Sequence, residues 1–462
     1  MERVREEPAS PNLIRSLGRW DVALLTVGAV IGSGIFLVPD KVLIATQMSP
    51  SLAAAVWLAG AILSLCGAIT YAELARRRPE AGGLYVYIRD GHGRVAAFVF
   101  GWMSLFVNNA GTVAALAAVA ASLLRPRLPT WIPTAWMACA LTIGLGVVNL
   151  LPARRAGNIQ GLTAIAKFSG ILFFAILLIA GAILKPHHVS QSTPAVTPFH
   201  ANITIALVAV LWAFEGWQYT TCAAGEVREA GRSVAFGLIA GVGGLAIVFL
   251  LTSLGVSLWL NQAELGSSVN VVEDALRKAG FPALSTLVTI ILPVAVLSAA
   301  HATLLTGSRV IYAMANDGLM PSLFARIRAQ SGIPVFAVGA CGLAATILAA
   351  LGTFDTLLAY VIVTSWLFYG LAGMAIFRIP AMEQRNRVLP RIAAVVFCAG
   401  SVGVMLSGLF DGPQSGRYGL ATAALGWIAG LAWFRWKDSV RGVVAPCDGE
   451  RRDRRKLPGS IS

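Results

Sequence analysis

The chain has 462 residues, of which 57% are hydrophobic and 13% are charged, and its formal net charge is +14. Soluble domains carry roughly 25% charged residues, so this composition excludes a protein whose whole surface faces water. The positive charge does not indicate a nucleic-acid-binding domain, because Lys and Arg are spread over alternating loops rather than gathered in one polar module.

Apolar runs of about 20 residues, each long enough to cross a hydrocarbon core of ~30 Å, recur along the chain. They predict an all-α integral membrane protein with twelve transmembrane helices and no large soluble insert. The predicted helices lie at 20–46, 51–76, 95–124, 131–151, 159–184, 201–225, 233–260, 283–313, 334–352, 355–378, 391–410 and 416–436. A polar tail at 1–19 precedes this membrane domain at 20–436, and a basic tail follows at 437–462.

The distribution of the 36 Lys and Arg residues predicts the orientation. Most of them lie in the two tails and in alternate loops, and positively charged loops face the cytoplasm. We therefore expect a multi-pass protein of the cell membrane with both termini cytoplasmic and no secretory signal peptide. In this topology, 261–281 is an extracellular connection able to form short helices over the outer mouth. The cytoplasmic stretch 76–93 is long enough for an interfacial helix that serves as an inner gate.

The first predicted helix contains an unusual segment at 28–36, with the sequence Gly-Ala-Val-Ile-Gly-Ser-Gly-Ile-Phe. Each glycine costs about 1 kcal/mol relative to alanine in a helix, so we expect the helix to break there. The amides of Ser33 and Gly34 would then begin an outer half-helix suited to binding a carboxylate. Carbonyls near Val30 would lack partners and could accept hydrogen bonds from an ammonium group. Close helix packing through small residues is the alternative.

The sixth predicted helix is interrupted at 212–217, where Trp-Ala-Phe-Glu-Gly-Trp places a carboxylate and a glycine within an apolar run. Two interrupted helices at corresponding positions of two halves indicate the substrate site of a transporter. Because an odd number of helices separates the breaks, the halves are expected to be inverted. This arrangement predicts a 5+5 inverted repeat at 20–184 and 201–378, with helices 11 and 12 added at 391–436.

Three polar residues within the apolar runs are candidate functional residues. Lys167 costs roughly 2.5–3.5 kcal/mol at mid-helix, so it either lines a polar interior or extends to the membrane surface. Glu215 could meet the positive end of a cationic substrate, carry a proton, or pair within the protein. His301 either lies near the substrate or makes an interhelical hydrogen bond. The six cysteines have no metal-ligand or disulfide spacing, and we expect no metal and no cofactor.

Four motifs in fixed order resemble the amino acid–polyamine–organocation (APC) superfamily. They lie at 27–36 with Pro39, at 71–74 with 79–87, at 212–217 with 225–227, and from 307–309 to 316–321. The Phe-Glu-Gly-Trp form of the third motif resembles the L-type amino acid transporter branch and its bacterial exchangers. The resemblance implies a LeuT-like fold with broken helices 1 and 6.

The resemblance also implies a role for individual residues. Amides around Ser33 and Gly34, together with Gly32, are implied to hold the substrate carboxylate. The substrate ammonium is implied to meet carbonyls of the breaks, which lie at Val30, Trp212 and Glu215 beside Gly216. Phe214 and Trp217 match aromatic positions that line or gate the site, although Trp217 could equally serve packing, and His301 matches a position near the substrate side chain. Lys167 matches a lysine that replaces the cation of sodium-coupled relatives, where it supports the broken helix or contributes a proton to coupling.

These observations predict a sodium-independent amino acid transporter, an antiporter of small or medium neutral L-amino acids that works by alternating access. The alternatives are a proton-coupled importer, a carrier of cationic amino acids and, more remotely, a channel or a membrane-embedded enzyme. The five histidines do not cluster as an enzyme would require. Animal L-type members bond to an accessory subunit through a cysteine between helices three and four. Because 125–130 contains no cysteine, we expect no disulfide-linked subunit.

Overall fold

The computed structural model of the chain describes residues 15–125, 129, 131–151, 153–184, 202–268, 270–328, 331–352, 354–381, 388–410 and 414–443. Within these ranges the backbone is helical, and the only β pairing consists of isolated bridges. The α-helices are α1 (Arg19–Val30), α2 (Gly34–Leu37), α3 (Pro39–Ala45), α4 (Pro50–Arg77), α5 (Leu84–His92), α6 (Arg94–Met103), α7 (Asn109–Leu124), α8 (Thr134–Val148), α9 (Ala153–Leu184), α10 (Ile203–Ala213), α11 (Ala230–Ser257), α12 (Gln262–Ser267), α13 (Val271–Lys278), α14 (Pro282–Asn316), α15 (Val335–Leu351), α16 (Phe354–Met374), α17 (Val388–Phe410) and α18 (Gln414–Val443).

Long apolar helices make this chain a multi-pass membrane protein. Within the described residues, seven helical segments are long and apolar enough to span a bilayer. They are Arg19–Leu37, Pro50–Arg77, Arg94–Leu124, Gly161–Leu184, Ala230–Ser257, Pro282–Asn316 and Val388–Ser407. Three shorter apolar helices in the described residues are Thr134–Val148, Val335–Leu351 and Thr364–Phe377. The all-α membrane class expected from the sequence is therefore confirmed, whereas the number of membrane crossings stays a prediction.

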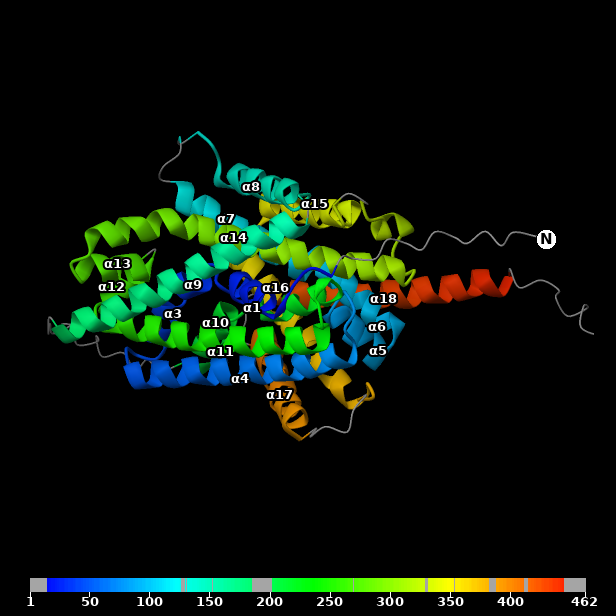
Figure 1. Cartoon of the computed structure of the whole chain (residues 1–462), viewed down its shortest axis with the longest axis horizontal. Coiled ribbons are helices and arrows are strands. Elements are labelled where there is room, and N and C mark those ends of the chain that lie inside the picture. The colour runs from blue at the N-terminus through cyan, green and yellow to red at the C-terminus, as the bar shows by residue number, and fades with distance from the viewer. Residues whose placement is uncertain are drawn as a thin grey trace, which may run out of the picture.

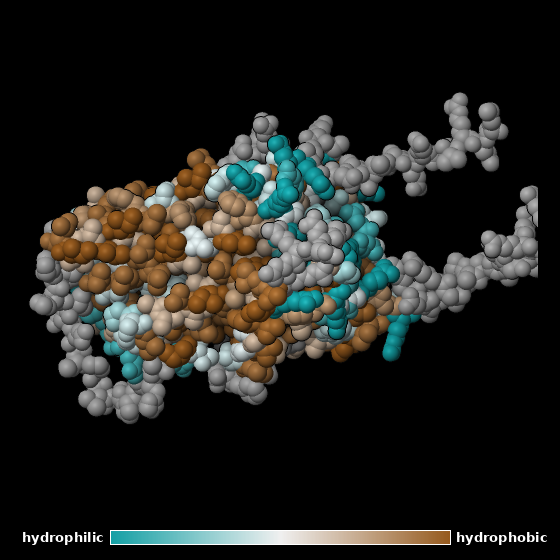
Figure 2. Space-filling model, turned by 60° about the horizontal axis from the view of Figure 1, so that its bottom comes forward, coloured by the Kyte–Doolittle hydropathy of each residue, from teal (hydrophilic) through white to brown (hydrophobic). Residues whose placement is uncertain are grey.

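The helices form an elongated bundle in which α4, α9, α11 and α14 run along the long axis (Figure 1). The short helices α12 and α13 lie at one end of this bundle, and α5 lies at the other. Hydrophobic residues cover most of the surface in Figure 2, while hydrophilic residues gather at the end that holds α5. The bundle therefore presents an apolar belt to lipid and a polar face beyond it.

The first break lies between α1 and α2. Helix α1 ends at Val30, and helical structure resumes at Gly34. The Gly32 amide donates to the Val30 carbonyl at 2.8 Å. The expectation that this carbonyl has no partner was therefore wrong, because the chain turns back on itself before the helix restarts.

The second break follows α10, which ends at Ala213. Gly216 has φ of +124°, a conformation that favours glycine, and the chain continues as a 3₁₀ helix over Trp217–Glu226. The two breaks touch each other: a Cβ on Gly216 would lie 2.7 Å from the Ala29 carbonyl oxygen. A Cβ on Gly34 would lie 2.6 Å from the Ala213 Cα. Glycine is needed at both positions because the two interrupted segments cross at backbone distance.

Both connections expected to be helical are helical. The 261–281 stretch holds α12 and α13, and α12 begins with a reciprocal cap in which Asn261 and Glu264 each accept the other's backbone amide, at 2.9 and 2.8 Å. The 76–93 stretch holds α5, which is tied to the end of α14 because Arg89 and Tyr85 both donate to Asp317 at 2.7 Å. Their roles as an outer cap and an inner gate stay predictions.

Candidate functional site

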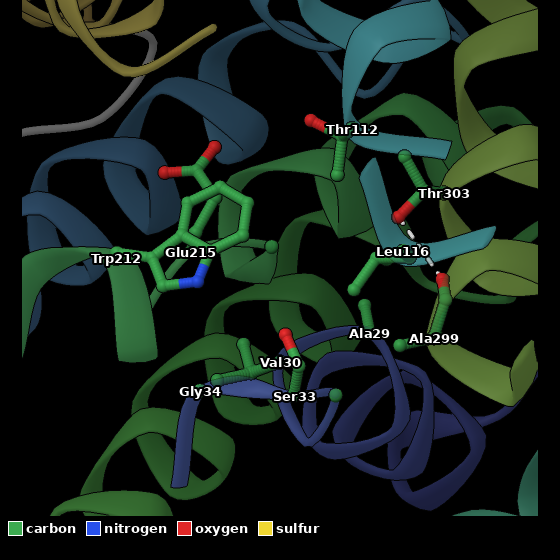
Figure 3. Close-up of a pocket in the computed structure, with 12 residues that line it drawn as sticks. Ala29, Val30, Ser33, Gly34, Thr112, Leu116, Trp212, Glu215, Ala299 and Thr303 are labelled. Atoms are coloured by element: carbon green, nitrogen blue, oxygen red, sulfur yellow. Dashed lines mark hydrogen bonds between the residues drawn. The ribbon is translucent and has the colours of Figure 1, made fainter. Parts of the chain in front are cut away.

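A small pocket lies where the two breaks meet. Its lining comes from five helices, α1, α2, α7, α10 and α14, and from the two breaks (Figure 3). The lining residues are Ala29, Val30, Gly32, Ser33, Gly34, Thr112, Leu116, Trp212, Glu215, Gly216, Ala299 and Thr303. The substrate-binding residues predicted from the sequence, Val30, Gly32, Ser33, Gly34, Trp212, Glu215 and Gly216, are all among them.

The first break presents unpaired hydrogen-bond donors to this pocket. Among the described residues, the amides of Ser33 and Gly34 donate to no backbone carbonyl, and the buried Ser33 hydroxyl has no hydrogen-bond partner. Figure 3 shows Ser33, Gly34 and Val30 together on one wall. Buried donors without partners are costly, so this wall is suited to an anionic group that accepts hydrogen bonds.

The carbonyls at the end of α1 are occupied by Lys167, which comes from α9. Its Nζ donates to the carbonyls of Gly28 and Ile31 at 2.7 Å each, and lies 3.4 Å from that of Ala295 on α14. The side chain is 5% exposed, so it does not extend to the membrane surface. A cation at the carboxyl end of a helix is electrostatically favourable. Lys167 therefore stabilises the inner end of the first break without lining the pocket.

At the second break, Glu215 and the Gly216 amide are hydrogen-bonded to side chains of the protein. The Glu215 carboxylate accepts hydrogen bonds at one oxygen, Oε1, from the Tyr369 hydroxyl and, at 2.5 Å, from the Gln218 amide. The side-chain oxygen of Gln218, Oε1, in turn accepts a hydrogen bond from the Gly216 backbone amide at 3.1 Å. In Figure 3 the Glu215 carboxylate lies beside the Trp212 indole. Of the three roles considered for Glu215, pairing within the protein describes its contacts.

The wall opposite the breaks was missed by the sequence analysis. It consists of Thr112 and Leu116 from α7 and of Ala299 and Thr303 from α14 (Figure 3). Thr112 Oγ1 donates to the Asn108 carbonyl at 2.7 Å, and Thr303 Oγ1 donates to that of Ala299 at 3.0 Å. Each hydroxyl thus donates its proton within its own helix and can still accept a hydrogen bond through its oxygen. The π-helix at Ser104–Asn108 precedes this wall on its α7 side, and such bulges are frequent at functional sites.

Two aromatic residues expected to line or gate the site do not line this pocket. The Phe214 ring packs against Trp57 and Phe249, with ring centroids 6.3 and 5.2 Å apart. The Trp217 ring packs against those of Tyr71 and Phe397, 5.3 and 5.9 Å away. The packing role considered for Trp217 therefore describes its position in this conformation.

His301 is also outside the lining of this pocket. Its Nδ1 lies 2.9 Å from the side-chain amide of Asn149, at the end of α8. The alternative role, an interhelical hydrogen bond, is what the structure has. Within the described residues, no group of His, Cys, Asp and Glu side chains is arranged to hold a metal ion.

Comparison with known proteins gives a consistent result. The family model described as amino acid permease matches residues 17–434. The human b(0,+)-type amino acid transporter 1 is 27% identical over 421 residues, which cover 88% of this chain and 85% of the relative. Its rabbit (Oryctolagus cuniculus) counterpart is 27% identical over 395 residues, covering 83% and 80%. The human Asc-type amino acid transporter 1 is 26% identical over 409 residues, covering 84% and 76%.

Proposed function

We propose that this chain, which belongs to the amino acid permease family, is a sodium-independent exchanger of small or medium neutral L-amino acids. Membership of that family and of the APC superfamily makes it an amino acid transporter rather than an enzyme. The selectivity, the absence of a sodium requirement and the exchange mode are the proposed part. The contacts around the two breaks support them.

The observation that carries the proposal is the pocket between the breaks. A zwitterion needs hydrogen-bond donors at one end and acceptors at the other. The amides of Ser33 and Gly34 supply the donors for the substrate carboxylate. The carbonyls of Val30, Trp212 and Glu215 supply acceptors for the ammonium. A carbonyl oxygen has two lone pairs, and those of Val30 and Trp212 each use one, for the amides of Gly32 and Glu215. Ala299 and Thr303, which also line the pocket, are small and favour a substrate with a short side chain.

The contacts of Lys167 support independence from sodium. A bound cation at the end of α1 would need the carbonyl oxygens of Gly28 and Ile31, and the Lys167 ammonium already lies 2.7 Å from each. The fixed ammonium thus supplies the positive charge that a sodium ion would otherwise supply. Support of the broken helix is the role of Lys167 in this proposal, and proton transfer by Lys167 is the competing role.

Alternating access would move the broken helices against the rest of the bundle. We propose twelve membrane-spanning helices in two inverted repeats, at 20–184 and 201–378, with two further helices at 391–436 and tails at 1–19 and 437–462. Because Lys- and Arg-rich segments usually face the cytoplasm, we propose that both termini are cytoplasmic and that the protein lies in the cell membrane. Phe214, Trp217 and His301 would gate the pocket in another conformation. An accessory subunit linked through a disulfide is not expected, because the connection after α7 contains no cysteine.

Uptake into proteoliposomes tests the mode of transport. Labelled L-alanine should enter vesicles loaded with unlabelled L-alanine, in the absence of sodium and without an effect of a pH gradient. Empty vesicles should not accumulate it. Accumulation in empty vesicles with inward-directed acid would instead show a proton-coupled importer. Exchange of L-lysine in preference to L-alanine would show a carrier of cationic amino acids, which the carboxylate of Glu215 in the lining makes the specific alternative.

A further inference from the structure

Glu215 is the only acidic side chain among the residues that line the pocket. Within the described part of the chain, it forms no ion pair with Lys, Arg or His. A carboxylate in the membrane interior is costly unless it is paired or hydrogen-bonded. Left to itself, it would attract any cation that enters the pocket, including a positively charged substrate side chain.

The protein satisfies this carboxylate with two neutral donors. The Tyr369 hydroxyl and the Gln218 amide both donate to Oε1 of Glu215, and the Gln218 amide also donates to the Tyr369 hydroxyl at 2.5 Å. Two donors, one from the 3₁₀ helix after the second break and one from α16, therefore meet at one carboxylate oxygen. Hydrogen bonds to an ionised group are stronger than those between neutral groups.

Both donors are themselves held in place. Tyr369 is 2% exposed, its backbone carbonyl accepts the Tyr71 hydroxyl at 2.9 Å, and its ring packs at 64° against Trp366. Gln218 is 1% exposed and its carbonyl oxygen is engaged by the Gly216 amide. Neither side chain can follow Glu215 if the carboxylate turns toward the pocket, so the contact either holds the carboxylate against α16 or is lost.

We propose that Tyr369 and Gln218 are positioning residues that determine specificity: they hold the Glu215 carboxylate against α16, so that the pocket accepts neutral and rejects cationic amino acids. The inference rests on the proposed function, because it assumes that the pocket between the breaks binds the substrate. It explains how a site lined by a carboxylate serves neutral substrates. The same hydrogen bond from Tyr369 connects the second break to α16, which is not one of the two interrupted helices.

The test compares two tyrosine-to-phenylalanine variants of the full-length protein in proteoliposomes. Tyr369→Phe removes a donor to the carboxylate. Tyr71→Phe is the matched control, because it removes a hydroxyl that bonds to α16 but has no hydrogen bond to Glu215. Each variant exchanges labelled L-alanine while unlabelled L-lysine or L-norleucine competes. In Tyr369→Phe, the L-lysine concentration that halves exchange should fall at least about tenfold, while that of L-norleucine, a neutral chain of similar length, should change by less than about twofold.

A double variant separates positioning from general loosening of the pocket. Adding Glu215→Gln to Tyr369→Phe should abolish the gain in L-lysine competition, because no carboxylate remains to attract the cation. If Tyr369→Phe does not fold, as judged by size-exclusion chromatography, Gln218→Leu removes the other donor and should show the same selective gain.

Three results would overturn the inference: wild-type exchange of L-lysine as fast as that of L-alanine, no gain in L-lysine competition on loss of a donor, or a gain that persists in the Glu215→Gln double variant. Wild-type protein that exchanges no amino acid at all would instead refute the proposed function, and the inference with it.

Discussion

The two breaks differ in how their unpaired backbone amides and carbonyls are satisfied. At the first break, Lys167 from α9 donates hydrogen bonds to the carbonyls of Gly28 and Ile31. The backbone amides of Ser33 and Gly34 donate to no backbone carbonyl in the described residues and face the pocket. At the second break, Gln218 takes up the Gly216 amide and helps to hold Glu215. Unwound backbone is tolerated inside a membrane only where protein or a water-filled cavity satisfies it. We therefore propose that a ligand satisfies the open amides of the first break, whereas at the second break the Gln218 side chain already satisfies the Gly216 amide.

Replacing Lys167 tests whether the first break needs its hydrogen bonds, and should have the largest effect on exchange. Lys167→Ala leaves the Gly28 and Ile31 carbonyls buried without their partner, at about 1–3 kcal/mol for each. We expect exchange to fall more than about tenfold and the Tm in detergent to decrease. Full exchange with an unchanged Tm would show that water replaces the ammonium and that the first break needs no fixed cation.

The contact between the breaks gives the next largest effect. A methyl group at Gly34 would lie 2.6 Å from the Ala213 Cα and 3.1 Å from its Cβ, so it meets the other broken helix rather than the pocket. Overpacking of this kind costs about 1–3 kcal/mol, and Gly34→Ala should abolish most exchange. Gly243→Ala is the matched control, since a Cβ there meets no atom within 4 Å. Equal activity of the two variants would refute the close crossing.

A substitution in the pocket wall formed by α7 and α14 should have a smaller effect, limited to the recognition of the substrate side chain. Thr303→Val keeps the shape of the side chain but removes the hydroxyl, which is worth about 0.5–1.5 kcal/mol as a hydrogen-bond partner. Competition by L-serine should weaken about twofold to tenfold relative to L-alanine. Thr252→Val, which loses a similar intrahelical bond of 2.7 Å on α11, should leave the ratio unchanged. An equal change in both variants would exclude Thr303 from side-chain recognition.

The polar end of the bundle provides a contrast, because charges there are paired with charges. Although burial opposes the effect, Arg89 and Arg78 hold the pKa of Asp90 below its ordinary value of 3.8. The stabilisation is therefore present above that value and is lost as the pH falls through the lower, folded-state pKa. Because the pair is partly exposed, the effect should stay below about 1 kcal/mol. Stability measured from pH 7 to pH 3 should fall less steeply in Asp90→Asn, and identical curves would contradict the pairing.

Both breaks could be predicted from the sequence because glycines and a carboxylate within an apolar run are costly in a continuous membrane-spanning helix. The same signal identified the residues from Val30 to Gly34 and from Trp212 to Gly216 that line the pocket. The partners of the breaks were harder to identify. Tyr369 is 154 residues away from Glu215 in the sequence, and only the fold brings the two together. Gln218 is three residues from Glu215, but the direction of its side chain depends on the turn at Gly216. Thr112 and Thr303 lie within apolar helices, where a single hydroxyl gives no signal of the face it occupies.

Where side chains or carbonyls differ from what was expected, the cause is physical as well. Phe214 and Trp217 lie on either side of Gly216, and both rings pack against other aromatic rings instead of lining the pocket. The direction of a side chain beyond a turn depends on backbone angles that the motif does not specify. Val30 was expected to offer a free carbonyl, but the local turn at Gly32 supplies a donor. Lys167 was found from its cost in an apolar helix, and its partners required the structure.

Competition by substrate analogues tests the central claim most directly, namely that the open amides of the first break and the carbonyls of both breaks bind the two ends of a zwitterion. Exchange of labelled L-alanine is measured against L-alanine, L-alaninamide and propionate, which differ in the presence of the carboxylate and of the ammonium. We predict that L-alanine competes fully and that neither analogue competes at a hundredfold higher concentration. Competition by either analogue at the concentration needed for L-alanine would contradict the account.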